Sequence, residues 1–184
     1  MNDRNDSYGL SKFCSKIYKC QANMINILHQ KLKEDEFRLL VQPEFVRSLE
    51  ISNTFIKRSN GSYFDGEDFV EAVPNAILIE LFGISTSVNT FPNLSKLPGK
   101  NQLIRFCYRP GKEDLYNFHS KFDVEKFKVF VTKNAAPKAT FIIQLGATQR
   151  ELHDTDTRKI NCLLRSWVPK EHTPIILLAN RRDA

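Results

Sequence analysis

The chain has little glycine, with seven Gly in 184 residues. Neither Gly-x-Gly-x-x-Gly nor a P-loop is present, because Pro98-Gly99-Lys100 lacks the P-loop's preceding Gly and its following Ser or Thr. We therefore expect no loop that cradles the phosphates of a nucleotide. The Gly-x-Ser-x-Gly turn, which carries the nucleophile of many Ser hydrolases, is also absent.

Closely spaced cysteines are absent as well. The four Cys residues are Cys14, Cys20, Cys107 and Cys162. None of them forms a Cys-x-x-Cys pair, so their spacing predicts neither a zinc site nor a redox motif. This use of cysteine is typical of reduced thiols in a cytosolic or nuclear protein.

One short cluster, His153, Asp154 and Asp156, has the residue types of a metal site. In an extended segment Asp154 and Asp156 share a face that His153 does not, so we expect no metal and no other cofactor. No catalytic motif stands out, and the chain is predicted not to be an enzyme. A divergent nuclease-like enzyme remains an alternative, which requires His153, Asp154, Asp114 and Glu80 to lie in one cleft.

Long apolar runs are missing too. The longest, Ile175–Ala179, is far short of the roughly 18–20 residues that a membrane-spanning helix needs. The first six residues are polar and of mixed charge, so no signal peptide is expected. These features predict an intracellular protein without membrane contact, located in the nucleus rather than the cytoplasm.

What the chain does have is an uneven distribution of charge. Residues 1–95 hold ten Lys and Arg against twelve Asp and Glu, a net charge of −2. Residues 96–184 hold 17 against nine, a net charge of +8. We expect one domain over residues 1–184, in which a loop at 84–99 separates the acidic half from the basic half. A cationic surface favours polyanions, of which nucleic acid is the commonest.

The basic half opens with a strand, predicted at Gln102–Arg109, between two Pro-Gly-Lys turns. Alternation puts Arg105 and Arg109 on one face, roughly 13 Å apart, while Lys100 and Lys112 lie at the turn tips. A second strand, predicted at 127–132, adds a cation and an aromatic side chain. Phosphates pair with cations and unpaired bases stack on aromatic rings in single-stranded nucleic acid sites. The predicted nucleic-acid-binding residues are Lys100, Arg105, Tyr108, Arg109, Lys112, Lys128 and Phe130.

Residues 10–33 are predicted to form an amphipathic helix, because apolar residues recur there at steps of three, four and seven. Such a stripe packs on its own domain or docks a partner chain. The predicted partner-binding residues are Phe13, Ile17, Met24 and Leu28. A protein partner is expected to bind through this helix or through the acidic half.

The order of elements favours an α+β fold with a mostly antiparallel sheet, of which a small barrel of the oligonucleotide-binding (OB) type is one form. A hairpin is expected between 127–132 and 139–145. The alternative is a mixed α/β sheet with a C-terminal βαβ unit made of 139–145, a helix at 157–167, and 175–179. Further strands are expected at 37–41, 45–51, 55–58, 62–64 and 76–82. No internal repeat at a period typical of solenoid proteins is expected.

These features lead to one main hypothesis and two alternatives. The main one is a non-enzymatic intracellular module that binds single-stranded or end-type DNA or RNA within a protein complex, as in chromosome-end (telomere), replication or ribonucleoprotein assemblies. The first alternative is a pure protein-interaction adaptor that binds an acidic partner. The second is the nuclease-like enzyme described above.

Overall fold

A computed structural model of the chain describes residues 7–99, 102–115, 118–145 and 150–180. Its main feature is a six-stranded sheet with the order β1-β3-β5-β6-β7-β8, so neighbouring strands follow one another along the chain. Every neighbouring pair in this sheet is parallel, as is the pair in a small second sheet, β2-β4. The strands are β1 (Met24–Leu28), β2 (Lys31–Lys33), β3 (Ser48–Ser52), β4 (Phe55–Lys57), β5 (Leu78–Ile84), β6 (Leu103–Pro110), β7 (Ala135–Leu145) and β8 (Ile175–Asn180).

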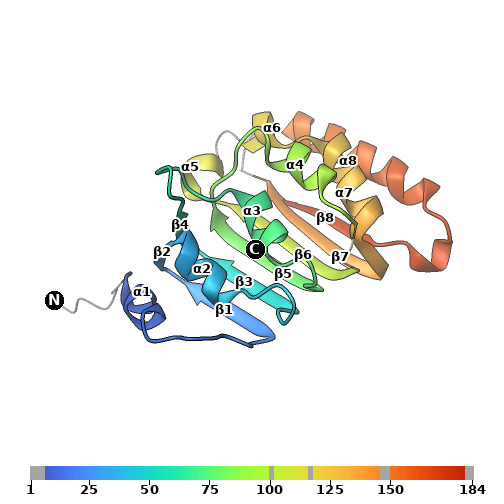
Figure 1. Cartoon of the computed structure of the whole chain (residues 1–184). Coiled ribbons are helices and arrows are strands. Elements are labelled where there is room, and N and C mark those ends of the chain that lie inside the picture. Colours follow the sequence, from blue (N-terminus) through green and yellow to red (C-terminus); the bar gives the residue numbers. More distant parts are fainter. Residues whose placement is uncertain (1–6, 100–101, 116–117, 146–149, 181–184) are drawn as a thin grey trace.

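Helices carry the chain back between the parallel strands. They are α1 (Gly9–Cys14), α2 (Glu34–Leu40), α3 (Gly66–Ala72), α4 (Thr90–Lys96), α5 (Lys112–Leu115), α6 (Phe118–Lys121), α7 (Val124–Asn134), α8 (Arg150–Ser166) and the short 3-10 helix η1 (Lys170–His172). When each right-handed connection leads from one parallel strand to the next in the same direction across the sheet, all the connecting helices lie on the same side of it. Figure 1 shows this one-sided arrangement, with α3, α4, α7 and α8 along one side.

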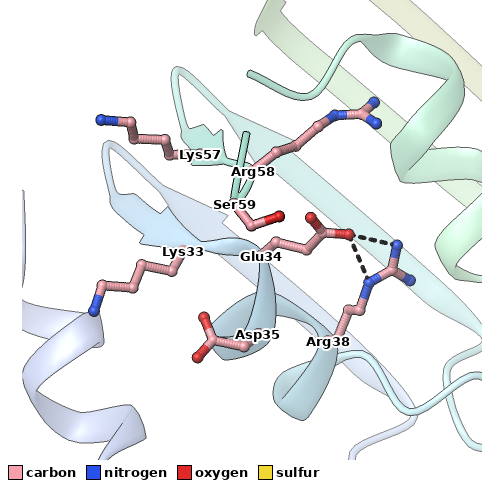
Figure 2. Close-up of a pocket in the computed structure, with 7 residues that line it drawn as sticks. All are labelled: Lys33, Glu34, Asp35, Arg38, Lys57, Arg58 and Ser59. Atoms are coloured by element: carbon pink, nitrogen blue, oxygen red, sulfur yellow. Dashed lines mark hydrogen bonds and ion pairs between the residues drawn. The ribbon is translucent and has the colours of Figure 1, made fainter. Parts of the chain in front are cut away.

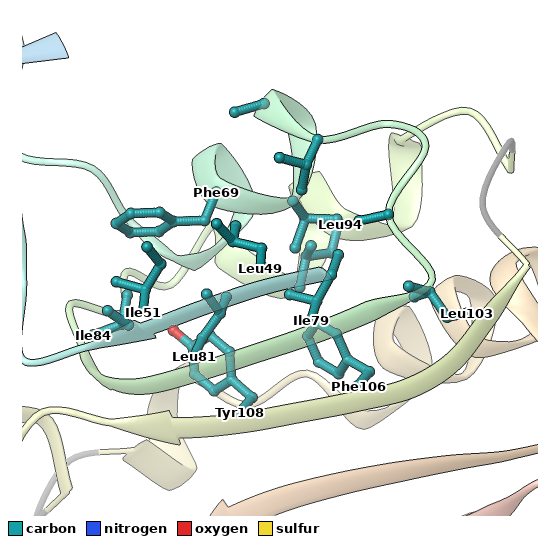
Figure 3. Close-up of a cluster of buried hydrophobic side chains, with 14 of the residues drawn as sticks. Leu49, Ile51, Phe69, Ile79, Leu81, Ile84, Leu94, Leu103, Phe106 and Tyr108 are labelled. Atoms are coloured by element: carbon teal, nitrogen blue, oxygen red, sulfur yellow. The ribbon is translucent and has the colours of Figure 1, made fainter. Parts of the chain in front are cut away.

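The core lies between the sheet and this helical layer. One register row runs across all six strands and is buried in each: Ile25, Leu49, Ile79, Phe106, Phe141 and Ile176. Figure 3 shows members of this row on neighbouring strands, beneath Phe69 of α3 and Leu94 of α4. Burial of such side chains stabilises the fold by about 1.5–3 kcal/mol each.

The α+β prediction with a mostly antiparallel sheet is wrong, and so is the OB-like barrel, because the main sheet is open and all-parallel. The error began with residues 127–132, which form part of α7 rather than a hairpin strand. Phe127, Phe130 and Val131 are buried there at helical spacing, and Asp123 caps the helix by accepting a hydrogen bond from the Lys126 backbone N–H at 3.0 Å. Over only six residues, the sequence pattern of a Phe-rich helix is hard to distinguish from that of a half-buried strand.

The alternative prediction, a mixed α/β sheet with a C-terminal βαβ unit, was correct in part. The β7–α8–β8 unit is present, with Phe141 paired to Ile176 in a parallel register. The sheet is not mixed, however. The strands expected at 76–82 and 102–109 are confirmed as β5 and β6. The run at 37–41 lies largely in α2, and the expected loop at 84–99 contains α4.

The predicted helix at 10–33 is also wrong. This stretch holds the six-residue helix α1, an irregular segment and the two strands β1 and β2. In β1 the side chains alternate between exposed and buried, with Ile25 and Ile27 in the core. Their spacing of two is the strand period, which the longer helical pattern obscured.

Two successive units repeat a short pattern, contrary to the expectation of no repeat. The segment that begins at Ile25 reads Ile-x-Ile-x-x-Gln-x-Leu, and 24 residues later the segment that begins at Leu49 reads Leu-x-Ile-x-x-Thr-x-Ile. The buried apolar positions Leu32 and Ile56 end these patterns and pair in the small sheet. The carboxyl end of this small sheet lies beside α2 (Figure 2). The architecture is therefore a short stack of strand-and-return units.

Candidate functional site

The side of the sheet away from the helices is the open face. Its central register row consists of Asn26, Glu50, Glu80, Cys107, Ile142 and Leu177. None of the α-helices in the described ranges covers it (Figure 1). Large apolar side chains are exposed at both edges: Met24 by 67% and Leu28 by 48% on β1, and Ile175 by 53% and Leu177 by 50% on β8. These side chains form two apolar pairs at opposite edges of the open face.

The centre of the open face is charged. Arg105 on β6 forms an ion pair with Glu80 on β5, and the Asn26 side-chain amide donates a hydrogen bond of 2.9 Å to Glu50. Arg109 is exposed on the same face, and no carboxylate within the described part of the chain pairs with it. The ion pair is partly exposed, so it contributes at most about 1 kcal/mol to stability.

Cys107 lies between these arginines on the same strand. Burial, and to a smaller extent the nearby Glu80, raise the pKa of its thiol to about 11, although Arg105 and Arg109 act in the opposite direction. The thiol therefore stays protonated at neutral pH. A nucleophilic Cys needs the thiolate, so Cys107 is not suited to that role.

Two of the hollows on the described part of the chain are lined by charged side chains. The larger, here called the α2 hollow, has a volume of about 580 Å³ and is lined by Lys33, Glu34, Asp35, Arg38, Lys57, Arg58 and Ser59 (Figure 2). Two of its cations are neutralised: Arg38 pairs with Glu34 at 2.8 Å, and Arg58 pairs with Asp68. The hollow therefore presents charges of both signs to a ligand.

The smaller, here called the strand-end hollow, lies where β3, β5 and β6 end. Its volume is about 380 Å³, and it is lined by Ser52, Asn53, Phe82, Gly83, Arg109, Pro110 and Lys112. The hollow therefore lies outside the carboxyl ends of three neighbouring parallel strands.

The predicted nucleic-acid-binding residues are only partly brought together. Arg105 and Arg109 share the open face, as alternation predicted, and Arg109 lies with Lys112 in the strand-end hollow. Arg105 is neutralised by Glu80. Lys100 lies outside the described residues.

The other three predicted residues are elsewhere. Tyr108 and Phe130 are fully buried in the core, so neither ring presents a face on which a base can stack. Lys128 lies on α7, in the helical layer on the opposite side of the sheet from Arg109, and pairs with Glu125 at 2.9 Å. The predicted stacking platform depended on a strand at 127–132, which is absent.

The predicted partner-binding residues do not form one helical stripe. Phe13 is exposed on α1, and Ile17 is half-buried in the segment that follows. Met24 and Leu28 both lie on the open face, at the β1 edge. Partner binding by these residues stays a prediction, but two of them are now part of a larger exposed surface.

The nuclease-like alternative required one acidic cleft. Glu80 pairs with Arg105 on the open face, whereas Asp114 pairs with Lys121 and accepts a hydrogen bond of 3.0 Å from the Thr86 backbone N–H. The side chain of His153 lies outside the described residues. Among the residues that are described, no three His, Cys, Asp or Glu side chains are grouped so as to hold a metal.

Sequence reasoning missed the strand-end hollow. Asn53 follows directly on β3, and Gly83 is the last residue but one of β5; both have positive φ, 46° and 68°. An Asn or a Gly at the end of an apolar strand was the available signal, because these residues tolerate that conformation best.

Within the described ranges, no helix combines the length and the apolar character needed to cross a membrane. Comparisons of the chain with protein-family models, with curated proteins and with solved structures gave no match.

Proposed function

We propose that this chain is a non-enzymatic interaction module that binds a protein partner on the open face of its sheet. The observation that carries the proposal is the exposure of large apolar side chains at both edges of a face that no described α-helix covers. Stacked strand-and-return units present extended surfaces of this kind for binding other chains.

The chemistry of the open face defines the partner. Leu177 and Ile175 favour apolar side chains near β8, while Arg109 offers an uncompensated positive charge in the middle of the sheet. An acidic segment with interspersed apolar residues complements both features. This is the acidic-partner adaptor that charge predicted, and the open face is the surface that we propose for it.

Nucleic acid is less favoured as the occupant of this face. Arg105, one of the two arginines on it, is already paired with Glu80. The predicted stacking residue Tyr108 is buried. A nuclear location remains a prediction, supported only by the net charge of +6.

The test compares two charge-introducing variants of exposed apolar residues. Leu177→Glu changes the open face, and Val129→Glu changes the exposed side of α7 as a matched control. We expect that a protein retained by the wild-type chain in a pull-down is lost with Leu177→Glu and kept with Val129→Glu. Equal retention by both variants, equal loss with both, or no protein retained by the wild type overturns the proposal.

A parallel measurement tests nucleic acid directly. Fluorescence anisotropy with a single-stranded oligonucleotide is recorded at about 50 mM and 200 mM salt, between which phosphate-driven binding falls by orders of magnitude. We expect no saturable binding at either concentration. Binding that weakens steeply with salt and is lost in Arg109→Glu contradicts the protein-partner proposal.

A further inference from the structure

The strand-end hollow combines a fixed backbone with free positive charge. Its floor is made where β3 and β5 end: the Asn53 backbone N–H donates to the Phe82 carbonyl at 2.8 Å, in line with the parallel pairing of the two strands. Beside it, the register of β5 against β6 shifts between Phe82 and Ile84. These contacts join three strand ends around one hollow of about 380 Å³.

The floor depends on glycine at position 83. A Cβ on Gly83 would collide with Oδ1 of Asn53 and lie 2.9 Å from its Cγ, so the Asn53 side chain packs directly on the Gly83 backbone. The positive φ of Gly83, 68°, adds a second reason for glycine, because side chains are strained there. The amide of Asn53 is thereby held in one place at the hollow.

The floor carries donor and acceptor groups. The Asn53 side-chain amide donates a hydrogen bond of 3.2 Å to the hydroxyl oxygen of Ser52, while Asn53 Oδ1 lies over Gly83. The Ser52 hydroxyl has one hydrogen that can be donated to a ligand oxygen.

The strand-end hollow differs from the α2 hollow in the charge of its lining residues. The strand-end hollow is lined by Arg109 and Lys112, and none of its described lining residues is acidic. The nearby carboxylates of Glu80 and Asp114 are paired with other cations, Arg105 and Lys121. In the α2 hollow, by contrast, Glu34 and Asp35 stand among the cations (Figure 2).

We propose that the strand-end hollow is a binding site for a phosphate monoester. An Arg guanidinium binds two phosphate oxygens at once, a Lys supplies a point charge, and two cations match the charge of a phosphate dianion. Phe82 and Pro110 add apolar wall, and the volume leaves space for the group to which the phosphate is attached. The ligand is either a small phosphorylated molecule or a phosphorylated side chain of a partner; only the second source rests on the proposed function.

Titration with inorganic phosphate, followed by NMR of the backbone amide signals of Asn53 and Gly83 in the hollow, tests the site itself. We expect saturable binding that weakens about 10- to 100-fold in Arg109→Gln and in Lys112→Gln. The matched control is Lys57→Gln, which removes one positive charge from the α2 hollow and should leave phosphate binding unchanged. Absence of saturable binding, or an equal loss with Lys57→Gln, overturns the proposal.

A peptide carrying one phosphoserine, compared with its unphosphorylated form, distinguishes the two sources. Binding of the phosphopeptide at least about tenfold tighter than inorganic phosphate, lost in Arg109→Gln, indicates a phosphorylated partner. Equal affinities indicate a small phosphorylated ligand. The Leu177→Glu variant separates the two proposals, because it should weaken partner binding while leaving inorganic phosphate binding intact. Phosphate binding without any partner on the open face therefore refutes only the proposed function.

Discussion

A substitution at Gly66 tests the contact between the helical layer and the sheet. Gly66 is the first residue of α3 and follows Asp65, which begins a capping box with Asp68. A Cβ at this position would collide with the ring of Tyr108, lying 2.7 Å from its hydroxyl oxygen and 2.9 Å from Cζ. The backbone of Gly66 does not need glycine for its conformation, since its φ is not positive. Any cost of Gly66→Ala is therefore steric.

The Tyr108 ring has no room to move away. It is fully buried, stacks on Phe106 and contacts Phe91 edge-on, and its hydroxyl lies 2.7 Å from that of Thr86. Overpacking of such a core costs about 1–3 kcal/mol. Alanine gains at most about 1 kcal/mol over glycine in a helix. With the full helical gain subtracted, we expect Gly66→Ala to lower the free energy of unfolding by up to about 2 kcal/mol.

Urea unfolding followed by circular dichroism measures this change, and a second background isolates its cause. In Tyr108→Leu the colliding atoms are gone, so Gly66→Ala should become neutral or slightly stabilising there. The control is Gly61→Ala, where φ is 88° and nothing lies within 4 Å of the added Cβ; it should cost about 1 kcal/mol in both backgrounds. An equal cost of Gly66→Ala in both backgrounds, or stabilisation of the wild-type chain, refutes the reasoning.

Three further predictions concern buried polar groups. Burial raises the pKa of the Glu67 carboxyl, although Asn93 donates a hydrogen bond of 3.1 Å to it. The folded state therefore binds the proton more tightly than the unfolded state, and stability falls as pH rises above the unfolded pKa of about 4.3. Glu67→Gln should raise the melting temperature at neutral pH and flatten its pH dependence. An unchanged pH profile contradicts this. Thr54→Val leaves the Gln30 backbone N–H without its 3.2 Å acceptor and should cost about 1–3 kcal/mol in urea unfolding; a loss below 0.5 kcal/mol or so argues against it. Cys107 should react with iodoacetamide at neutral pH at least about 100-fold more slowly than a thiol of ordinary pKa, and rapid labelling in the folded protein refutes its raised pKa.

The strands of the sheet were largely predictable, and their pairing was not. Strands β5 and β8 are short apolar runs bounded by turn residues, a signal that survives in a single sequence. Whether two strands pair parallel or antiparallel depends on what lies between them. Once 127–132 was interpreted as a strand, a hairpin with β7 followed, and the helix α7 that makes the parallel return was lost.

The candidate site was predictable only in its local periodicity. Alternation correctly put Arg105 and Arg109 on one face, because it depends on the strand alone. It did not place Glu80 opposite Arg105, since that contact joins residues from two different strands. The burial of Tyr108 likewise depends on α3 and α4, which lie far from it in the sequence.

The sheet topology turns the uneven charge along the sequence into an uneven distribution of charge across the sheet. Because strand order follows chain order, the acidic half of the sequence contains β1, β3 and β5, and the basic half contains β6, β7 and β8. A difference along the chain therefore becomes a difference from one edge of the sheet to the other. For the proposed acidic partner, this predicts attraction toward the β8 edge, where Ile175 and Leu177 offer apolar contact. Charge of this kind governs the rate and direction of approach more than the final affinity, so salt should slow association with the open face more than it speeds dissociation.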